Sequence, residues 1–141
     1  MDTDCPFCAI GRGEADADLV AFRGSDVFVV PALKQRPSNP GQVLVCPVSH
    51  EVMLHRLQAN VREGLFEVVS QVTAAATRAF GAVGTTVLIN NCAPDQTLHH
   101  LHIHVIPRFD NDDLMIPNAD GAPAPRDLRL QLASKLRAAL V

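Results

Sequence analysis

The stretch His99-His100-Leu101-His102-Ile103-His104-Val105-Ile106-Pro107-Arg108 decides the fold, and it contains four of the six histidines in the chain. From His100 onward, polar and apolar residues alternate until a final apolar pair. Alternation with a period of two predicts a β-strand with one buried face. His100, His102 and His104 would then share the other face at a spacing of about 6.5 Å. We expect Pro107 to end the strand, because proline cannot donate to a β-ladder.

A row of three imidazoles suits two kinds of chemistry, because imidazole gains and loses a proton near neutral pH. Side chains two residues apart on a strand could chelate a metal ion. Alternatively, one imidazole could attack an electrophile while another donates a hydrogen bond to an anion. A plain polar strand face is the remaining interpretation. The strict register beside an apolar face favours a reactive site, and the pattern alone leaves the two chemistries open.

Length and composition indicate one globular domain over residues 1–141. Nearly half of the residues are apolar, so the chain can bury an ordinary hydrophobic core. A net charge of −3 gives no support for a nucleic-acid or membrane partner. The sequence has no run of about 18 apolar residues, and no basic leader followed by an apolar stretch. We therefore expect a cytoplasmic protein.

Hydrophobic patterning predicts an α+β domain in which strands outnumber helices. Apolar residues recur at helical spacing over residues 59–80, and Gly81 is placed to end this long amphipathic helix. Short connections favour an antiparallel five-stranded meander sheet with the long helix packed on it. The predicted strands are 19–22, 27–30, 42–46, 85–89 and 100–106, residues 109–125 form a loop or flap, and residues 126–140 form a C-terminal helix.

The histidine stretch resembles the signature of the histidine-triad family, His-x-His-x-His followed by two apolar residues. Gln96-Thr97 resembles the Gln-Ser/Thr pair that the family places before its first histidine. The motif Cys5-x-x-Cys8-x-Ile10 resembles the N-terminus of zinc-containing bacterial members. Two further stretches also resemble the family: Gly41-Gln42-Val43-Leu44-Val45-Cys46-Pro47 with His50, and Leu88-Ile89-Asn90-Asn91. The five matches occur in order over residues 5–108, most of the domain.

The resemblance implies a nucleotide hydrolase or transferase that acts at the α-phosphate of a nucleoside phosphoramidate, a dinucleoside polyphosphate or a related nucleotide. His102, the middle histidine, would attack phosphorus and form a nucleotidyl-histidine intermediate, which water then hydrolyses. His104 would donate to the phosphate oxygens, and His100 would orient its neighbour. Family members are usually homodimers, so we expect a homodimer. The resemblance also implies substrate contacts from Asn90, Gln96, Thr97, Phe7 and Ile10.

Cys5 and Cys8 stand three positions apart in a Cys-x-x-Cys motif, which suits either zinc binding or dithiol redox chemistry. The redox fold needs a strand before the motif and a helix after it, whereas only four residues precede Cys5 and glycines soon follow Cys8. A closed tetrahedral zinc site needs two further ligands, and the resemblance implies His50 and His100. We therefore expect a structural zinc site that takes no part in the chemical step.

Three positions depart from the family pattern. Pro31 stands near the place of an acidic residue that binds the ribose hydroxyls. Asp95 replaces a glycine that would let backbone approach phosphate closely. Gln42 replaces a histidine, an exchange that we expect to have little effect.

We also expect the acidic residues of the run 110–113 to be solvated.

Two other functions remain open on the sequence. The chain could be a nucleotide-sensing or protein-binding module that keeps the fold without turnover, because Pro31 and Asp95 alter the expected site. It could also be a metal-dependent hydrolase with the three histidines as zinc ligands. A chelator would abolish only the metal-dependent reaction, and a His102 variant assayed with an adenosine phosphoramidate separates turnover from binding.

Overall fold

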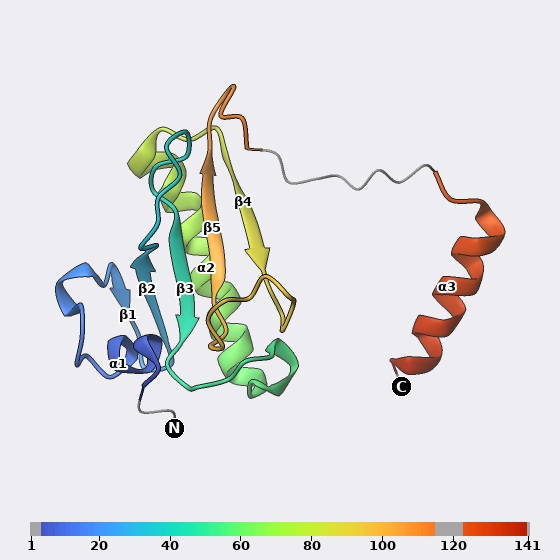
Figure 1. Ribbon diagram of the computed structural model, residues 1–141, viewed down its shortest axis with the longest axis horizontal. Helices are drawn as coiled ribbons and strands as arrows, with labels where there is room; N and C mark the ends of the chain where they lie inside the picture. The colour runs from blue at the N-terminus through green and yellow to red at the C-terminus, as the bar shows by residue number, and fades with distance from the viewer. Residues whose placement is uncertain (1–3, 115–122, 141) are drawn as a thin grey trace.

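The computed structural model describes residues 4–114 and 123–140, and an antiparallel five-stranded sheet forms its centre (Figure 1). One long helix packs on this sheet, and a second helix follows near the C-terminus. The architecture is therefore the α+β fold that the sequence predicts. The strands are β1 (Phe22–Arg23), β2 (Val27–Pro31), β3 (Val43–Pro47), β4 (Gly84–Ile89) and β5 (Ile103–Arg108). The α-helices are α1 (Pro6–Gly11), α2 (Ala59–Phe80) and α3 (Arg126–Ala139).

The strand order is β1-β2-β3-β5-β4, which departs from a meander at one place. β4 is an edge strand although it precedes β5 in the chain, because α2 carries the chain across the sheet before β4 forms. β5 then returns between β3 and β4. Its residue His104 lies opposite Leu44 of β3 and opposite Leu88 of β4. Pairing on both sides fixes the direction in which the side chains of β5 point.

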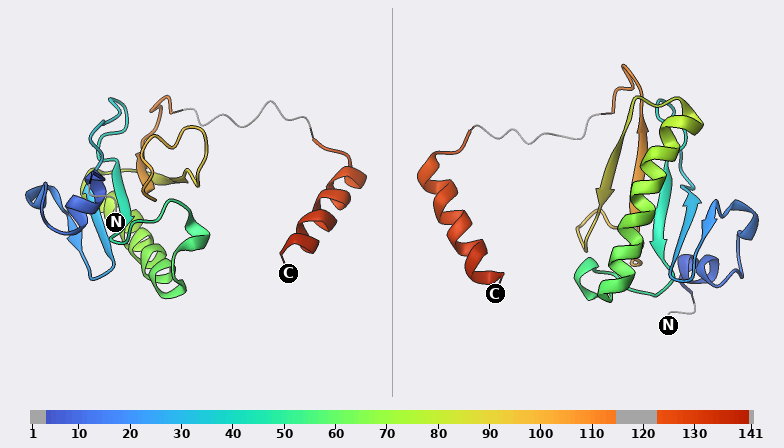
Figure 2. Two further views of the ribbon diagram at one scale, coloured as in Figure 1. Left: turned by 60° about the horizontal axis from the view of Figure 1, so that its bottom comes forward. Right: turned by 180° about the vertical axis from the view of Figure 1, so that it is seen from behind.

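α2 occupies the range that the apolar periodicity predicts, and it covers one face of the sheet (Figure 2). Gly81 ends the helix with a φ of 68°, and its N–H donates to the carbonyl of Thr77 at 3.1 Å. This left-handed conformation favours glycine, which has no Cβ to clash. The core on this face joins residues of α2 to alternate strand residues, including Leu65, Val68, Val27, Val29, Val45, Ile103 and Val105.

α1 and the residues around it cover part of the opposite face of the sheet. Phe7 of α1 packs edge-on against Phe28 of β2, with ring centroids 6.4 Å apart. Burial raises the pKa of the Cys46 thiol far above its usual range, so Cys46 is an unreactive core residue. Because α1 covers only part of this face, side chains of β5 on the same face remain available for chemistry.

The histidine strand begins later than the sequence predicts. β5 starts at Ile103, so His100 and His102 lie in the segment that leads into it, and the chain bends at His100. The N–H of Leu101 holds this segment by donating to the carbonyl of Glu51 at 2.6 Å. The alternation of side chains therefore persists although the ladder has not yet begun.

The strand also continues past Pro107, where the sequence predicts its end. Pro107 lies opposite Thr85 of β4. Its carbonyl accepts from the side chain of Asn39 at 2.9 Å, on the side away from β4. The N and the carbonyl of one strand residue point to the same side, so the missing N–H does not interrupt the β4 ladder.

Asp112 is buried, contrary to the expectation of a solvated acidic run. Its carboxylate accepts from Arg108 at 2.6 and 3.0 Å and from Asn39 at 2.7 Å. The backbone N–H groups of Phe109 and Leu114 donate as well. The bond with Arg108, and then these other donors, hold the pKa of Asp112 far below its usual range. The carboxylate thus ties the end of β5 to the loop between β2 and β3.

α3 begins directly after Pro125, as the sequence predicts. None of its described residues is buried, and its leucines are exposed. Residues 115–122 of the predicted flap lie outside the described residues, so the flap stays a prediction. No helix in the described part of the chain has the length and apolar character needed to cross a membrane.

Candidate active site and metal centre

His102 and His104 lie on the sheet face opposite α2. The intervening Ile103, together with Val105, belongs to the core under α2. The rings of His102 and His104 meet edge to face, with centroids 4.9 Å apart. The alternation that the sequence predicts is therefore confirmed, and it brings two imidazoles into contact.

A backbone carbonyl decides which nitrogen of His102 is free. Nδ1 of His102 lies 2.7 Å from the carbonyl oxygen of His100. A carbonyl oxygen can only accept, so Nδ1 carries the proton and Nε2 keeps its lone pair. The ring of Phe7 packs edge-on against the imidazole at 5.3 Å between centroids. In the neutral imidazole of His102, Nε2 is thus the nitrogen without a proton, which is the tautomer that a nucleophile at Nε2 requires.

Gln42 decides the proton position on His104. Its Nε2 lies 3.0 Å from Nδ1 of His104. An amide nitrogen can only donate, so Nδ1 accepts and Nε2 of the imidazole carries the proton. Burial lowers the pKa of His104 to about 4, and the nearby charges of His102 and Arg36 add to the effect. His104 is therefore a neutral hydrogen-bond donor at neutral pH, and sequence reasoning missed the contribution of Gln42.

A hollow of about 410 Å³ opens beside His102, a volume within the usual range for small-molecule sites. Its lining is mainly apolar. Phe7, Ile10 and Thr97, three of the predicted substrate contacts, line it together with His102. The structure therefore brings these three residues to the predicted nucleophile, although they come from distant parts of the chain.

Gln96 and Asn90, the other two predicted substrate contacts, are not among the described residues that line this hollow. The side chain of Gln96 is buried and bonds its own loop: Oε1 accepts from the N–H of Cys92 at 2.6 Å, and Nε2 donates to the carbonyl of Leu98 at 3.2 Å. Gln96 thus braces the turn before the histidine stretch. Its contact with substrate, like that of Asn90, stays a prediction.

Cys5, Cys8, His50 and His100 converge at the end of the sheet next to α1. Their four donor atoms all lie within 4.8 Å of one another. Nδ1 of His100 is 3.4 Å from Sγ of Cys5 and 3.6 Å from Sγ of Cys8, and Nδ1 of His50 is 3.2 Å from Sγ of Cys8. A tetrahedral zinc ion with ordinary bond lengths places sulfur and nitrogen ligands about 3.6 Å apart. The four residues therefore fit a structural Cys₂His₂ zinc site.

A further hydrogen bond orients His100 for this site. Its Nε2 lies 2.8 Å from the carbonyl of Pro47, so Nε2 carries the proton and the unprotonated Nδ1 faces the cysteines. Such a second bond is typical of zinc-bound histidine. The backbone carbonyl of His100 also holds His102, so one residue connects the metal centre to the predicted nucleophile. Four protein ligands leave no open position for substrate, which makes this a structural site.

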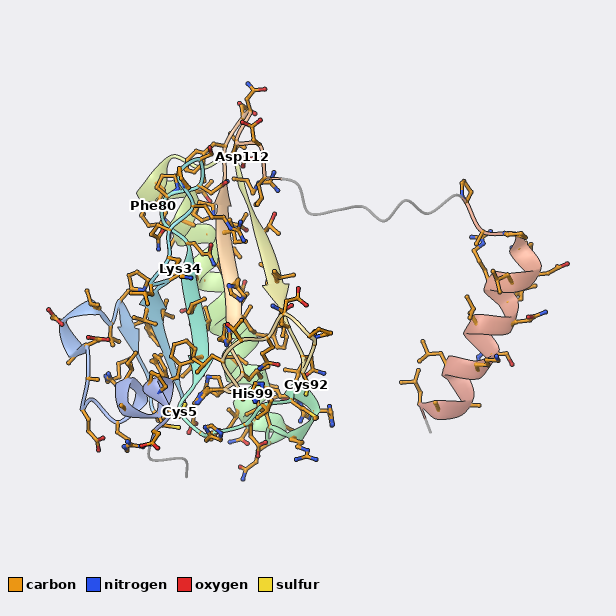
Figure 3. The ribbon with its side chains drawn as sticks, viewed as in Figure 1. Cys5, Lys34, Phe80, Cys92, His99 and Asp112 are labelled. Carbon is orange, nitrogen blue, oxygen red and sulfur yellow. The ribbon has the colours of Figure 1, made fainter. Side chains whose placement is uncertain are left out.

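Cys5 and His99 lie at the same end of the molecule (Figure 3). Asp112 and Phe80 lie at the opposite end, and Lys34 lies between the two ends. His99, which precedes the triad out of register, is exposed. A second hollow, of about 280 Å³, lies between α2 and β1–β3, but its lining is apolar apart from Gln71.

The sequence matches the model of the HIT domain over residues 12–111. It is 31% identical over 115 residues to the adenylylsulfatase HINT3 of Arabidopsis thaliana, covering 81% of this chain and 57% of that protein. It is 32% identical over 124 residues to an uncharacterized HIT-like protein of Mycobacterium tuberculosis, covering 87% and 83%. It is 28% identical over 115 residues to the bis(5'-adenosyl)-triphosphatase of Dictyostelium discoideum, covering 74% and 77%.

Solved structures agree with these matches. A Streptococcus mutans protein superposes with a TM-score of 0.87 at 26% identity, covering 100% of this chain and 88% of that one. A zinc-bound histidine triad family protein from Mycobacterium smegmatis superposes with a TM-score of 0.67 at 31% identity, covering 96% and 97%. The bound zinc of the second structure agrees with the ligand geometry found at Cys5, Cys8, His50 and His100. By its matched domain, its fold and its metal centre, the chain belongs to the HIT domain family.

Proposed function

We propose that this protein cleaves a nucleotide at its α-phosphorus through a nucleotidyl-histidine intermediate on His102. The observation that supports this most directly is the bond from Nδ1 of His102 to the carbonyl of His100, because it leaves Nε2 unprotonated. His102 also lines the hollow that is large enough for a nucleotide. Two similar proteins are named for nucleotide hydrolysis, an adenylylsulfatase and a bis(5'-adenosyl)-triphosphatase.

In the first step, the lone pair on Nε2 of His102 forms a bond to the α-phosphorus. The bond from phosphorus to the leaving group breaks, and the leaving group departs with the bonding electrons and takes up a proton from solvent. Nε2–H of His104 donates to a phosphate oxygen as charge develops there. Phe7 and Ile10 contact the nucleoside on the apolar side of the hollow.

In the second step, water attacks the same phosphorus and loses a proton to solvent. The bond between phosphorus and Nε2 breaks, and His102 recovers its lone pair while the nucleoside monophosphate leaves. Dividing one displacement into two steps lets a neutral imidazole serve as the nucleophile near pH 7. The metal centre lies outside both steps, because its four ligands come from the protein.

A comparison of two histidine variants tests the proposal. His102→Ala should lower kcat for adenosine 5'-phosphoramidate by at least about a thousandfold, because it removes the attacking atom. His99→Ala is the matched control, since His99 is exposed and adjacent in sequence, and its activity should stay near the wild-type value. Acid-quenched wild-type protein should also show a mass increase of one adenylyl group that His102→Ala lacks.

Two outcomes would overturn this proposal. Near-normal turnover by His102→Ala, with zinc content unchanged, would remove His102 as the nucleophile. Nucleotide binding without turnover by the wild type would instead indicate a binding module. The structure gives no support to zinc held by the three histidines, because the metal-binding cluster found in residues 4–114 and 123–140 takes His100 and leaves out His102 and His104.

A further inference from the structure

Lys34 reaches the hollow beside His102 from the loop between β2 and β3. It lines that hollow together with Pro31 and Leu33 on one side and Thr97 on the other. Figure 3 shows Lys34 between the end of the molecule with Cys5 and the end with Asp112. No carboxylate of residues 4–114 or 123–140 lies within ion-pair distance of Lys34. Lys34 is therefore a cation on the wall of a nucleotide-sized hollow that forms no ion pair with the described residues.

The loop that carries Lys34 is held firmly by buried or paired side chains. Gln35 ties the neck of the loop, because its Nε2 donates to the carbonyls of Ala32 and Gln42 and its Oε1 accepts from the N–H groups of Gly41 and Gln42. Four hydrogen bonds from one side chain fix both ends of the loop relative to each other. Lys34 thus projects from a braced backbone, which lowers the entropy cost of placing its charge.

A second cation stands on the same loop. The tip of the loop is anchored by Asn39, whose side chain donates to Pro107 and Asp112 and whose N–H donates to the carbonyl of Arg36 at 3.0 Å. Arg36 lines a different hollow, together with Asp112 and Asp113, so Lys34 is the cation of this loop that faces the hollow beside His102. No aspartate or glutamate occurs between Asp26 and Glu51, so this loop is purely basic.

We propose that Lys34 binds a second phosphoryl or sulfuryl group of the substrate, beyond the phosphate that His102 attacks. This inference rests on the proposed function and narrows it to nucleotides that carry two anionic groups. The second group belongs either to the leaving group, as in a dinucleoside polyphosphate, or to the ribose. Asp16 is the carboxylate that lines the hollow, and it disfavours an anion on its own side. A lysine ammonium on a flexible stem suits either position, because it acts as a point charge with three donors.

Lysine labelling tests binding without turnover. The chain has two lysines, Lys34 and Lys135, and Lys135 lies on α3 as an internal control. An amine-acylating reagent is applied with and without a methylene-bridged, non-hydrolysable diadenosine triphosphate, and peptides are quantified by mass spectrometry. The bound nucleotide should slow acylation of Lys34 by about fivefold and leave Lys135 unchanged, because a bound ammonium is shielded. Equal labelling with and without a saturating nucleotide would overturn the inference.

Kinetics with three substrates distinguish the two sources of the second anion. The substrates are adenosine 5'-phosphoramidate, its 3'-phosphorylated form, and diadenosine triphosphate. Lys34→Met should lower kcat/KM about tenfold for a substrate with a second anion, and less than about twofold for the first substrate. A loss confined to diadenosine triphosphate places the anion in the leaving group, and a loss confined to the 3'-phosphorylated form places it on the ribose. Lys34→Arg, which keeps the charge, should retain most of the activity, and Lys135→Met should match the wild type.

The results of these experiments distinguish a failure of the second-anion site from a failure of the proposed His102 mechanism. If the wild type turns over all three substrates and Lys34→Met slows them equally or not at all, the second-anion site is wrong while the His102 mechanism stands. If the wild type turns over none of them, the proposed function fails, and the labelling result alone decides whether Lys34 binds an anion. The advantage in kcat/KM of substrates with a second anion should also shrink as the salt concentration rises, because added ions screen exposed charges.

Discussion

Single hydrogen bonds decide which nitrogen of each imidazole can react. The proton lies on Nε2 in His100, on Nδ1 in His102 and on Nε2 in His104, because their partners are Pro47, His100 and Gln42 in turn. The first arrangement frees a nitrogen toward the cysteines, the second frees one for attack, and the third leaves one as a donor. Three identical side chains on one segment thus acquire three different capabilities.

The contact between Gln42 and His104 predicts a change in rate that is separable from binding. Gln42→Leu removes the donor to Nδ1, so His104 can also adopt the tautomer that offers no proton to phosphate. We expect kcat for adenosine 5'-phosphoramidate to fall about tenfold with little change in KM. Gln42→His can also donate to Nδ1 and should recover most of the loss. Equal kcat for Gln42→Leu and the wild type would show that the contact has no function.

The lowered pKa of His104 predicts how stability depends on pH. Its folded pKa is about 4, while an unfolded histidine titrates near 6.5, so the unfolded chain takes up the proton first as pH falls. The contribution of neutral His104 is therefore complete above about pH 6.5 and is lost as pH falls toward 4. Between about pH 6.5 and 5 the loss is at most about 2 kcal/mol.

Urea unfolding at two pH values measures this contribution. The wild type should lose up to about 2 kcal/mol more than His104→Gln between pH 6.5 and 5, because the variant has no imidazole to titrate at this position. Protonation of the zinc ligands affects both proteins and cancels in the comparison. An identical loss in the two proteins would contradict the assignment of a low pKa to His104.

At the level of residues, the sequence predicts which side chains share a face of the sheet, but it does not predict which distant residues they bond. The alternation around Ile103 places His102 and His104 on one face, and the structure confirms this. The bond from Gln42 joins residues 62 positions apart, and the buried cluster around Asp112 joins it to Asn39 73 positions away. Contacts of this kind depend on the strand register, which local patterns do not specify.

Among the elements, α2 offers a test in which one substitution has opposite effects at two glycines. Gly64 lies inside the helix, and nothing stands within 4 Å of where its Cβ would be. Gly64→Ala should therefore stabilise the protein by about 1 kcal/mol through helix propensity. Gly81 also has open space, but its φ of 68° is unfavourable for alanine. Gly81→Ala should destabilise the protein by about 1 kcal/mol.

Urea unfolding of both variants checks the sign of each effect. The two substitutions add the same methyl group at open positions, so the difference between them reports backbone conformation alone. Destabilisation by Gly64→Ala would indicate that helix propensity is overridden there by a contact the structure does not contain.

The elements also differ in how far the sequence predicts them. α2 is self-contained: its apolar stripe and its terminal glycine lie within one continuous stretch, so its bounds are predicted correctly. The order of the strands is not local, because β5 pairs with β3 and β4 only after α2 has carried the chain across the sheet. Non-local pairing also explains why Pro107 lies inside β5 and does not end it. Its nitrogen faces away from β4, so it interrupts no hydrogen bond of the β4 ladder.

Across the whole molecule, the zinc ligands join three separate parts of the chain. Cys5 and Cys8 come from the N-terminal segment and α1, His50 follows β3, and His100 precedes β5. The four ligands therefore connect these segments at the end of the sheet where the histidine stretch leads into β5. Because the ligands meet only in the folded chain, the free energy of zinc binding contributes directly to the stability of the fold.

Removal of the metal should therefore destabilise the protein, and one cysteine provides a matched control. Cys5→Ser should abolish the single zinc equivalent and lower Tm by at least about 10 °C, because a hydroxyl is a poor zinc ligand and the remaining ligands cannot close the site. Cys92 is exposed and is not one of the four residues of the cluster, so Cys92→Ser should keep both the zinc and the Tm. Metal analysis and thermal unfolding of the wild type and the two variants measure the zinc content and the Tm together.

Exchange of zinc for cadmium should change kcat by less than about threefold, since a closed structural site does not touch the substrate. An ion that activates water would alter the rate far more. A large change in kcat on exchange, with Tm preserved, would contradict the structural assignment.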